Sequence, residues 1–280
     1  MIDLDTVVVD AHSLPALPQS ACRLATMLTS GDYDLAEVAE VIRLDPVLTA
    51  NLLRRANSAR LGGVEEIVDV RQAVMRMGPA EALGIAVSGP ARPSLESSLD
   101  AYGITTGQLW RHSVAAALAV EKMSSMRLFR PLPESFATAL LHDLGLALIG
   151  RQLRPNLAES IRRSRMEGHR STVDSELEIL GVHHGEAGGL AAANWGLGES
   201  IVEGIVHHHA PEGATTQRGR MNARTVMLAD AVAIQIGAST GDAGALVSQE
   251  LDSSLCAPSD FRELCSAVAE EFDSVLSRYA

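Results

Sequence analysis

The sequence predicts an all-α fold, and three observations support this prediction. Ala and Leu dominate the composition while aromatic residues make up only 3% of it, a balance that favours helices packed through small and aliphatic side chains. Nearly every strongly periodic segment places its apolar residues at helical spacing. We find neither a Gly-rich phosphate loop after a strand nor an internal repeat, and 280 residues leave room for one large domain or two smaller ones.

The first expected helices have local start signals. Pro15 and Pro18 introduce a helix over residues 19–28, which ends before the sequence TSGDYD. Asp34 and Glu37 have the spacing of a capping box, with Asp as the capping residue, ahead of LAEVAEVIRL. These signals predict two consecutive helices near the start of the chain.

Three more helices and a connection are expected before residue 107. Asp45 suits the N-cap of a helix in LDPVLTANLLRRANSA, because Pro46 at the first helical position loses no hydrogen bond. Helices are also expected over residues 70–77 and 80–87. Residues 88–107 are rich in Gly, Pro and Ser, which predicts a connection and a soft boundary.

The second half of the chain is also expected to be helical. Thr105 or Thr106 caps a long helix with WRHSVAAALAVEKM, and Pro133 and Glu134 open the helix that contains ALLHDLGLAL. Residues 213–222 are expected to form a mobile loop. The other expected helices contain NLAESIRRSRMEG, STVDSELEIL, HHGEAGGLAAANWG, ESIVEGIVHH, ARTVMLADAVAIQIG and SDFRELCSAVAEEFDSVLSRYA, the last with Phe261, Leu264, Val268, Phe272 and Val275 on one apolar face.

Charge and terminal sequence argue against several classes of function. A formal net charge of -12 disfavours non-specific nucleic-acid binding, which needs an excess of Lys and Arg. The N-terminus lacks the order of a signal peptide, and no run of about 18 uncharged apolar residues predicts a membrane span. The three cysteines are odd in number and lack metal-binding spacing, which favours a reducing compartment. We therefore expect a cytoplasmic protein.

Metal-capable side chains recur where apolar ones are expected. An ionised carboxylate such as that of Asp143 is costly in an apolar helix unless it has a partner. Imidazole and carboxylate are ligands of Zn, Fe and Mn, and several of them on different helices would form a bundle-type site. His142 and Asp143 are consecutive, so they leave one helix about 100° apart and can both reach such a site. The six places are His112, the pair His142 and Asp143, the pair His183 and His184, Glu186, the run 207–209, and Asp230.

Each of these residues also has a purely structural interpretation. A single helical histidine is more often a hydrogen-bonded core or surface residue than a ligand. Asp230 could simply accept a hydrogen bond from a neighbouring helix. No linear motif here fixes a metal geometry as a zinc-finger spacing would.

The order of these residues resembles the metal-ligand order of the HD superfamily of phosphohydrolases. From about residue 14 to 212, the chain is similar to the HDOD family, the HD-related output domain of bacterial signalling proteins. The segments that carry this resemblance are LPALP, DPVLTANLLRRANSA, QAVMRMG, LWRHSVAAA, ALLHDLG, ELEILGVHHGEAGGLAAANWGL and IVHHHAPE.

The resemblance implies a multi-helix HD-like domain with an N-terminal helical subdomain. Residues 1–100 would be the N-terminal half of the module, 101–212 the HD-like half, and 213–280 an extension that completes or flanks the HD-like core. The same resemblance implies one or two divalent ions, Fe, Zn or Mn, held by His112, His142, Asp143, His184, His208, His209 and Asp230.

Departures from the catalytic relatives bear on function. The related HD-GYP phosphodiesterases carry a Lys where this chain has Leu146, and a Gly-Tyr-Pro segment that is missing after His209. A phosphohydrolase needs positive groups near the substrate phosphate, and Arg111 and Arg151 are the nearest candidates by sequence.

These features favour a regulatory signal-transduction module over an enzyme. Its partner would be a regulatory protein or a small signalling ligand, and the last helix could pack on its own domain or form a homodimer. The first alternative is a metal-dependent phosphohydrolase that acts on a nucleotide or cyclic dinucleotide. The second is a helical scaffold with hydrogen-bonded His and Asp networks and no metal.

Overall fold

The computed structural model describes residues 14, 17–57, 67–126, 130–168, 171–240 and 256–279. Across these residues the chain is helical and contains no strand, which confirms the all-α prediction. Pro15 lies outside the described residues. The helices are α2 (Gln19–Ser30), α3 (Leu35–Arg43), α4 (Pro46–Ala56), α5 (Val70–Met77), α6 (Pro79–Leu95), α7 (Gln108–Ser125), α8 (Ser135–Leu141), α9 (Leu144–Gln152), α10 (Pro155–Gly168), α11 (Thr172–Leu180), α12 (His184–Asn194), α13 (Glu199–Val206), α14 (Gln217–Gln235) and α16 (Pro258–Tyr279), with the 3-10 turns η2 (Asp100–Tyr102) and η3 (Pro211–Gly213).

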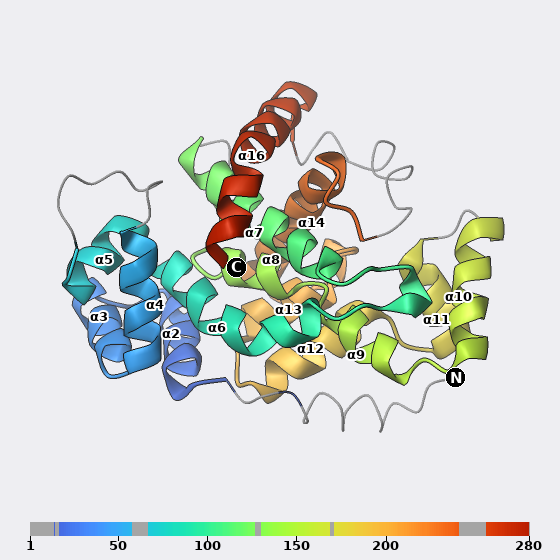
Figure 1. Cartoon of the computed structure of the whole chain (residues 1–280), viewed down its shortest axis with the longest axis horizontal. Helices are drawn as coiled ribbons and strands as arrows, with labels where there is room; N and C mark the ends of the chain where they lie inside the picture. Colours follow the sequence, from blue (N-terminus) through green and yellow to red (C-terminus); the bar gives the residue numbers. More distant parts are fainter. Residues whose placement is uncertain are drawn as a thin grey trace.

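Figure 1 shows three regions along the long axis of the molecule. Helices α2 to α5 gather at one end, and α10 and α11 lie at the other end beside η2. Helices α7, α8, α9, α12, α13 and α14 form the centre, and α16 packs on α7 and α14. None of the described helices is long and apolar enough to cross a bilayer.

Helix starts in the N-terminal region follow the predicted signals. The side chain of Asp34 accepts a hydrogen bond from the backbone N–H of Ala36 and so caps α3, but Glu37 does not complete the predicted capping box. Asp45 accepts from the backbone N–H of Leu48 at 3.0 Å, and α4 begins at Pro46. These two caps confirm the predicted beginnings of α3 and α4.

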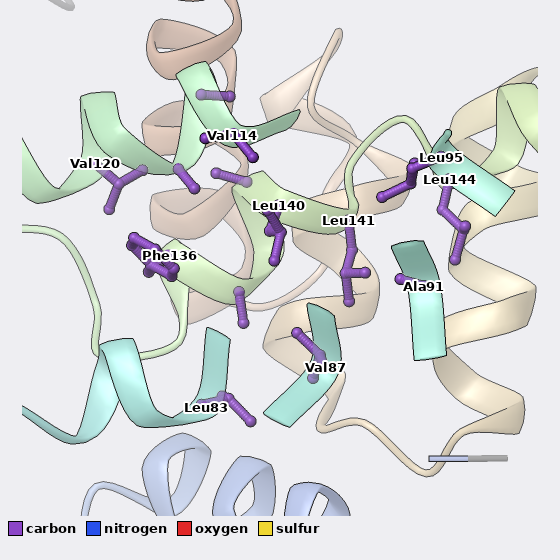
Figure 2. Close-up of a cluster of buried hydrophobic side chains, with 14 of the residues drawn as sticks. Leu83, Val87, Ala91, Leu95, Val114, Val120, Phe136, Leu140, Leu141 and Leu144 are labelled. Atoms are coloured by element: carbon purple, nitrogen blue, oxygen red, sulfur yellow. The ribbon is translucent and has the colours of Figure 1, made fainter. Parts of the chain in front are cut away.

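Helix α6 continues where the sequence predicts a connection. It runs to Leu95 through Pro90 and Pro93, so the expectation of a connection over residues 88–107 was wrong for its first eight residues. A proline inside a helix costs about 3 kcal/mol because its ring clashes and its N–H is missing. Burial offsets this cost, since every fourth residue of α6 faces α8 and α9 (Figure 2). This stripe comprises Leu83, Val87, Ala91 and Leu95.

Helix α7 begins without the predicted threonine cap. Gly107, at a φ of 77°, occupies the N-cap position, and no side chain caps the helix there. The side chain of Gln108 instead accepts from the backbone N–H of Thr105 at 3.0 Å. The expectation that Thr105 or Thr106 caps this helix was therefore wrong.

The helix that contains ALLHDLGLAL is broken at its polar pair. Helix α8 ends at Leu141 and α9 begins at Leu144, so His142 and Asp143 lie between two helices rather than within one. Gly145, two residues after Asp143, packs backbone against backbone on α12, where a Cβ atom would lie 1.8 Å from the backbone oxygen of His184. The break therefore turns the polar pair inwards while α9 stays in contact with α12.

The predicted loop over residues 213–222 is only partly a loop. Helix α14 begins at Gln217, with Thr216 accepting at its N-cap from the backbone N–H of Gly219. Arg218 then donates to both oxygens of the buried Glu134 and to the carbonyl oxygen of Leu28 on α2. These contacts fix the second part of the segment as helix.

Candidate metal centre

The structure brings all seven predicted ligands together in the centre of the helical array. They are His112 on α7, His142 and Asp143 between α8 and α9, His184 at the start of α12, His208 and His209 after α13, and Asp230 on α14. They form two groups, in each of which the ligand atoms lie within 4.8 Å of one another. The His112 group contains His112, His142 and Asp230, and the His184 group contains Asp143, His184, His208 and His209.

Asp143 lies between the two groups and faces both of them. Its Oδ2 atom is 3.4 Å from Nε2 of His112 and 3.5 Å from Nε2 of His142. Its Oδ1 atom is 3.5 Å from Nε2 of His184 and 3.8 Å from Nε2 of His208. One carboxylate could therefore serve an ion in each group.

The backbone sets the orientation of both rings in the His112 group. Nδ1 of His112 lies 2.8 Å from the carbonyl oxygen of Ala238, and Nδ1 of His142 lies 2.7 Å from that of Ala139. A carbonyl oxygen only accepts, so each Nδ1 must carry a hydrogen and each neutral ring presents an Nε2 lone pair. These Nε2 atoms are 3.1 Å apart, and Oδ1 of Asp230 is 3.1 Å from that of His112.

The His184 group has a similar arrangement. Nδ1 of His208 donates to the carbonyl oxygen of Ile205 at 2.6 Å, and its buried Nε2 has no hydrogen-bond partner among the described residues. Nε2 of His184 lies 2.9 Å from Nε2 of His209. A buried nitrogen without a partner is costly, and a bound cation would satisfy the Nε2 lone pair of His208. The donor set therefore fits a divalent metal ion.

Glu176 contacts this group and Tyr102 contacts Glu176, and neither residue was predicted from the sequence. Nδ1 of His184 lies 2.7 Å from Oε2 of Glu176, on α11, and its backbone N–H donates to the same oxygen at 2.8 Å. The hydroxyl of Tyr102 donates to Oε1 of Glu176 at 2.7 Å. Tyr102 lies 74 positions from Glu176, and no local signal in the sequence connects them. The only signal in the sequence is that Glu176 lies eight positions before His184, in a segment with helical periodicity.

The charges in the cluster shift its pKa values strongly. Burial alone would lower the pKa of His112, but the hydrogen bond and charge of Asp230, together with the charge of Asp143, raise it to about 9. The pKa of His184 also rises to about 9, because the charge and hydrogen bond of Glu176 outweigh burial. Burial would raise the pKa of Asp143, but the charges of the surrounding histidines lower it. Without metal, the cluster therefore holds protons.

The pKa of His208 moves in the opposite direction. Burial and the positive charges of neighbouring histidines lower it well below the ordinary value of 6.5. Its ring therefore stays neutral and keeps a free lone pair at Nε2, in the form that binds metal. Except for the exposed His209 and for Asp230, whose side chain is 14% exposed, the ligands are buried.

Two other metal-capable residues of the sequence, His183 and Glu186, cap a helix. The side chain of His183 caps α12 by accepting from the backbone N–H of Gly185, and Glu186 accepts from the backbone N–H of His183 at 3.0 Å. This reciprocal pair is a capping box. His183 and Glu186 therefore begin the helix that presents His184.

The two predicted phosphate contacts bind other partners. The guanidinium of Arg111 lies 3.7 Å from Asp273 and 5.0 Å from the ring centroid of Phe272, both on α16. Arg151 donates to the hydroxyl of Ser94 at 3.3 Å. Neither contact belongs to the cluster, and a role for these arginines in phosphate binding stays a prediction.

The chain is similar in sequence to known proteins over most of its length. A family model described as the HDOD domain matches residues 14–211. A curated relative from Treponema pallidum (strain Nichols), described as an uncharacterized protein, is 26% identical over 208 residues. The match covers 71% of this chain and 39% of that relative, so the chain spans about two fifths of its length.

Two solved structures have the same fold. An HDOD domain protein from Geobacter sulfurreducens aligns with a TM-score of 0.67 and 21% identity over 99% of this chain and 98% of its own. A candidate signal transduction protein from Marinobacter aquaeolei VT8 aligns with a TM-score of 0.66 and 22% identity over 95% of this chain and 59% of its own. The likeness to the Geobacter sulfurreducens protein therefore extends beyond the residues that the family model matches.

Proposed function

Because this chain belongs to the HDOD domain family, we propose that it is a regulatory signal-transduction module that holds divalent metal without hydrolysing a substrate. One or two ions of Fe, Zn or Mn would bind in the His112 and His184 groups. The module would act in the cytoplasm on a regulatory partner protein or a small signalling ligand. The Marinobacter aquaeolei protein with the same fold is described as a candidate signal transduction protein, which agrees with such a role.

The observation that carries the proposal is a complete ligand set beside a buried Leu146. This leucine is 4% exposed and belongs to the hydrophobic core, at the position where the catalytic relatives carry a lysine. Arg111 and Arg151, the nearest arginines in sequence, bind other partners. Catalysis on a phosphate ester needs positive groups that stabilise developing charge, so this environment favours binding over turnover.

A bound ion would neutralise the carboxylates of Asp143 and Asp230 and accept the Nε2 lone pairs. The protein's own residues orient the donors: backbone carbonyl oxygens hold three of the rings, and Glu176 holds His184. The ions would therefore link α7, the α8–α9 break, α12, α13 and α14 at one point. In this role they stabilise one arrangement of the helices that a partner can recognise.

A metal-dependent phosphohydrolase acting on a nucleotide or cyclic dinucleotide is the second candidate. The sharing of Asp143 between the two groups favours it, because paired ions bridged by a carboxylate suit phosphoester chemistry. In such an enzyme the ions would lower the pKa of bound water to about 7.

Metal analysis and an activity screen separate these functions. Purified protein is reconstituted with Zn²⁺, Mn²⁺ or Fe²⁺, its metal content is measured, and it is screened against phosphodiesters, with His142→Ala in parallel. We expect bound metal and no turnover that depends on His142. Metal-dependent hydrolysis that is lost in His142→Ala would establish the enzyme, and a protein that binds no metal after reconstitution would indicate a scaffold.

A further inference from the structure

A buried chain of hydrogen bonds runs from η2 through α11 to the first residue of α12. The hydroxyl of Tyr102 donates to one oxygen of Glu176, and the other oxygen accepts from both the ring and the backbone N–H of His184. Glu176 is fully buried and Tyr102 is 4% exposed. Every contact described for this carboxylate leads to His184 or to the tyrosine that holds it.

His184 differs from the other oriented histidines of the cluster in its acceptor. The rings of His112, His142 and His208 donate to neutral backbone carbonyl oxygens, whereas His184 donates to a carboxylate. A carboxylate acceptor fixes the tautomer more strongly and makes the opposite ring nitrogen a better ligand. That opposite atom, Nε2, points towards Asp143 and His209.

We propose that Glu176 and Tyr102 are positioning residues that set the metal affinity of the His184 group and leave the His112 group unchanged. The inference rests on the proposed function, because it concerns ions bound in the cluster. Burial of a carboxylate is costly, and a role in orienting a ligand accounts for both its location and its contacts. Through these residues, α11 and η2 act on a site to which they contribute no ligand.

The test is a Glu176→Gln variant, which keeps the shape of the side chain and removes its charge. The amide oxygen can still accept from His184, and the amide NH₂ can donate to the oxygen of Tyr102. Zn²⁺ titration against a competing chelator yields the dissociation constant of each ion. We expect one constant to rise by about 10- to 100-fold, the size typical for loss of such an outer partner, while the other is unchanged. Tyr102→Phe should weaken the same ion by a smaller factor.

Two further variants show which ion Glu176→Gln weakens and whether the loss is specific to the cluster. In His142→Ala the His112 group is incomplete, so Glu176→Gln in that background should weaken the remaining ion. Glu134→Gln is the matched control, because Glu134 is equally buried but pairs with Arg218 and contacts no ligand. It should lower the melting temperature and leave both zinc affinities unchanged.

The outcomes separate this inference from the proposed function. Equal zinc affinities in the wild type and Glu176→Gln, or an equal loss at both ions, would overturn the positioning role alone. A wild-type protein that binds no Zn²⁺ would overturn the proposed function and this inference with it.

Discussion

Nε2 of His112 and Nε2 of His142 lie 3.1 Å apart, although the residues are 30 positions apart in the sequence. The Nδ1 hydrogen of each ring is donated to a backbone carbonyl oxygen. The Nε2 lone pairs of the two neutral rings therefore point at each other. Such an arrangement is unfavourable unless a proton or a cation lies between the nitrogens. The cluster is thus built to hold one or the other.

Asp143 and His142 should differ in the number of ions that they control. Because each oxygen of Asp143 faces one group, Asp143→Ala should abolish high-affinity binding of both ions. His142→Ala should remove only the ion of the His112 group. Metal content per chain, measured after reconstitution and dialysis, checks both expectations. A loss of both ions in His142→Ala would contradict the division into two groups.

Without metal, stability should be greatest near pH 6.5. The pKa values of His112 and His184 are raised to about 9, so the stability that they contribute is present below pH 6.5 and is lost as the pH rises through 9. The pKa of His208 is lowered from 6.5, so its contribution is lost as the pH falls below that value.

Thermal unfolding with a chelator present, between about pH 5 and 9, measures this dependence. Because metal replaces the protons of His112 and His184, zinc affinity should rise with pH, and saturating Zn²⁺ should remove the loss of stability at high pH. A melting temperature of the metal-free protein that rises steadily up to pH 9 would contradict the proton-binding role of these histidines.

Gly145 should be intolerant of even one added methyl group. A Cβ there would lie 1.8 Å from the backbone oxygen of His184 and 2.7 Å from the backbone nitrogen of Gly188, and backbone atoms cannot rotate away. Gly145→Ala should therefore cost about 3 kcal/mol or more, at the upper end for overpacking, and should separate Asp143 from His184. Chemical denaturation and zinc titration measure the two effects.

Gly89→Ala is the control for that substitution. Gly89 is exposed in α6, and an added Cβ would meet nothing within 4 Å. Its replacement by alanine should change the stability by less than about 1 kcal/mol, because the gain in helix propensity is offset by crowding of the new Cβ against the ring of Pro90. A similar loss of stability in both variants would show that helix geometry, and not the contact with α12, sets the cost.

Arg218 should contribute strongly to the stability of the fold. It makes two hydrogen bonds to the fully buried Glu134, at 2.7 and 2.8 Å, and one to the carbonyl oxygen of Leu28 at 3.0 Å. Arg218→Ala leaves a buried carboxylate without its cation and should cost about 3 kcal/mol. Arg224→Ala, which breaks an exposed pair with Glu212 on the same helix, should cost under about 0.5 kcal/mol in the same assay.

Local patterns predicted most helices, and together with the resemblance they singled out the seven residues that the structure brings together in the cluster. Caps such as Asp34 and Asp45 act within a few residues, so they are visible in the sequence. The ligands were found because His and Asp stand out in apolar helical segments, and because their order resembles that of a known superfamily. Their metal binding itself stays a proposal.

The features that the sequence did not reveal depend on tertiary contacts. The break between α8 and α9 accompanies the close packing of Gly145 on α12, and α6 passes through Pro90 because its buried stripe outweighs the cost of the proline. The hydrogen bond between Tyr102 and Glu176 joins residues that only the fold brings together. None of these contacts has a signature in neighbouring residues.

Helix α14 connects the cluster to the N-terminal helices. Near the start of α14, Arg218 donates hydrogen bonds to Glu134 and to the carbonyl oxygen of Leu28 on α2. Asp230 lies twelve residues later, about 18 Å along the same helix, and faces His112. An ion that fixes Asp230 therefore restrains the helix at one end while the arginine restrains it at the other. One continuous helix therefore carries both a residue of the cluster and the arginine that contacts α2.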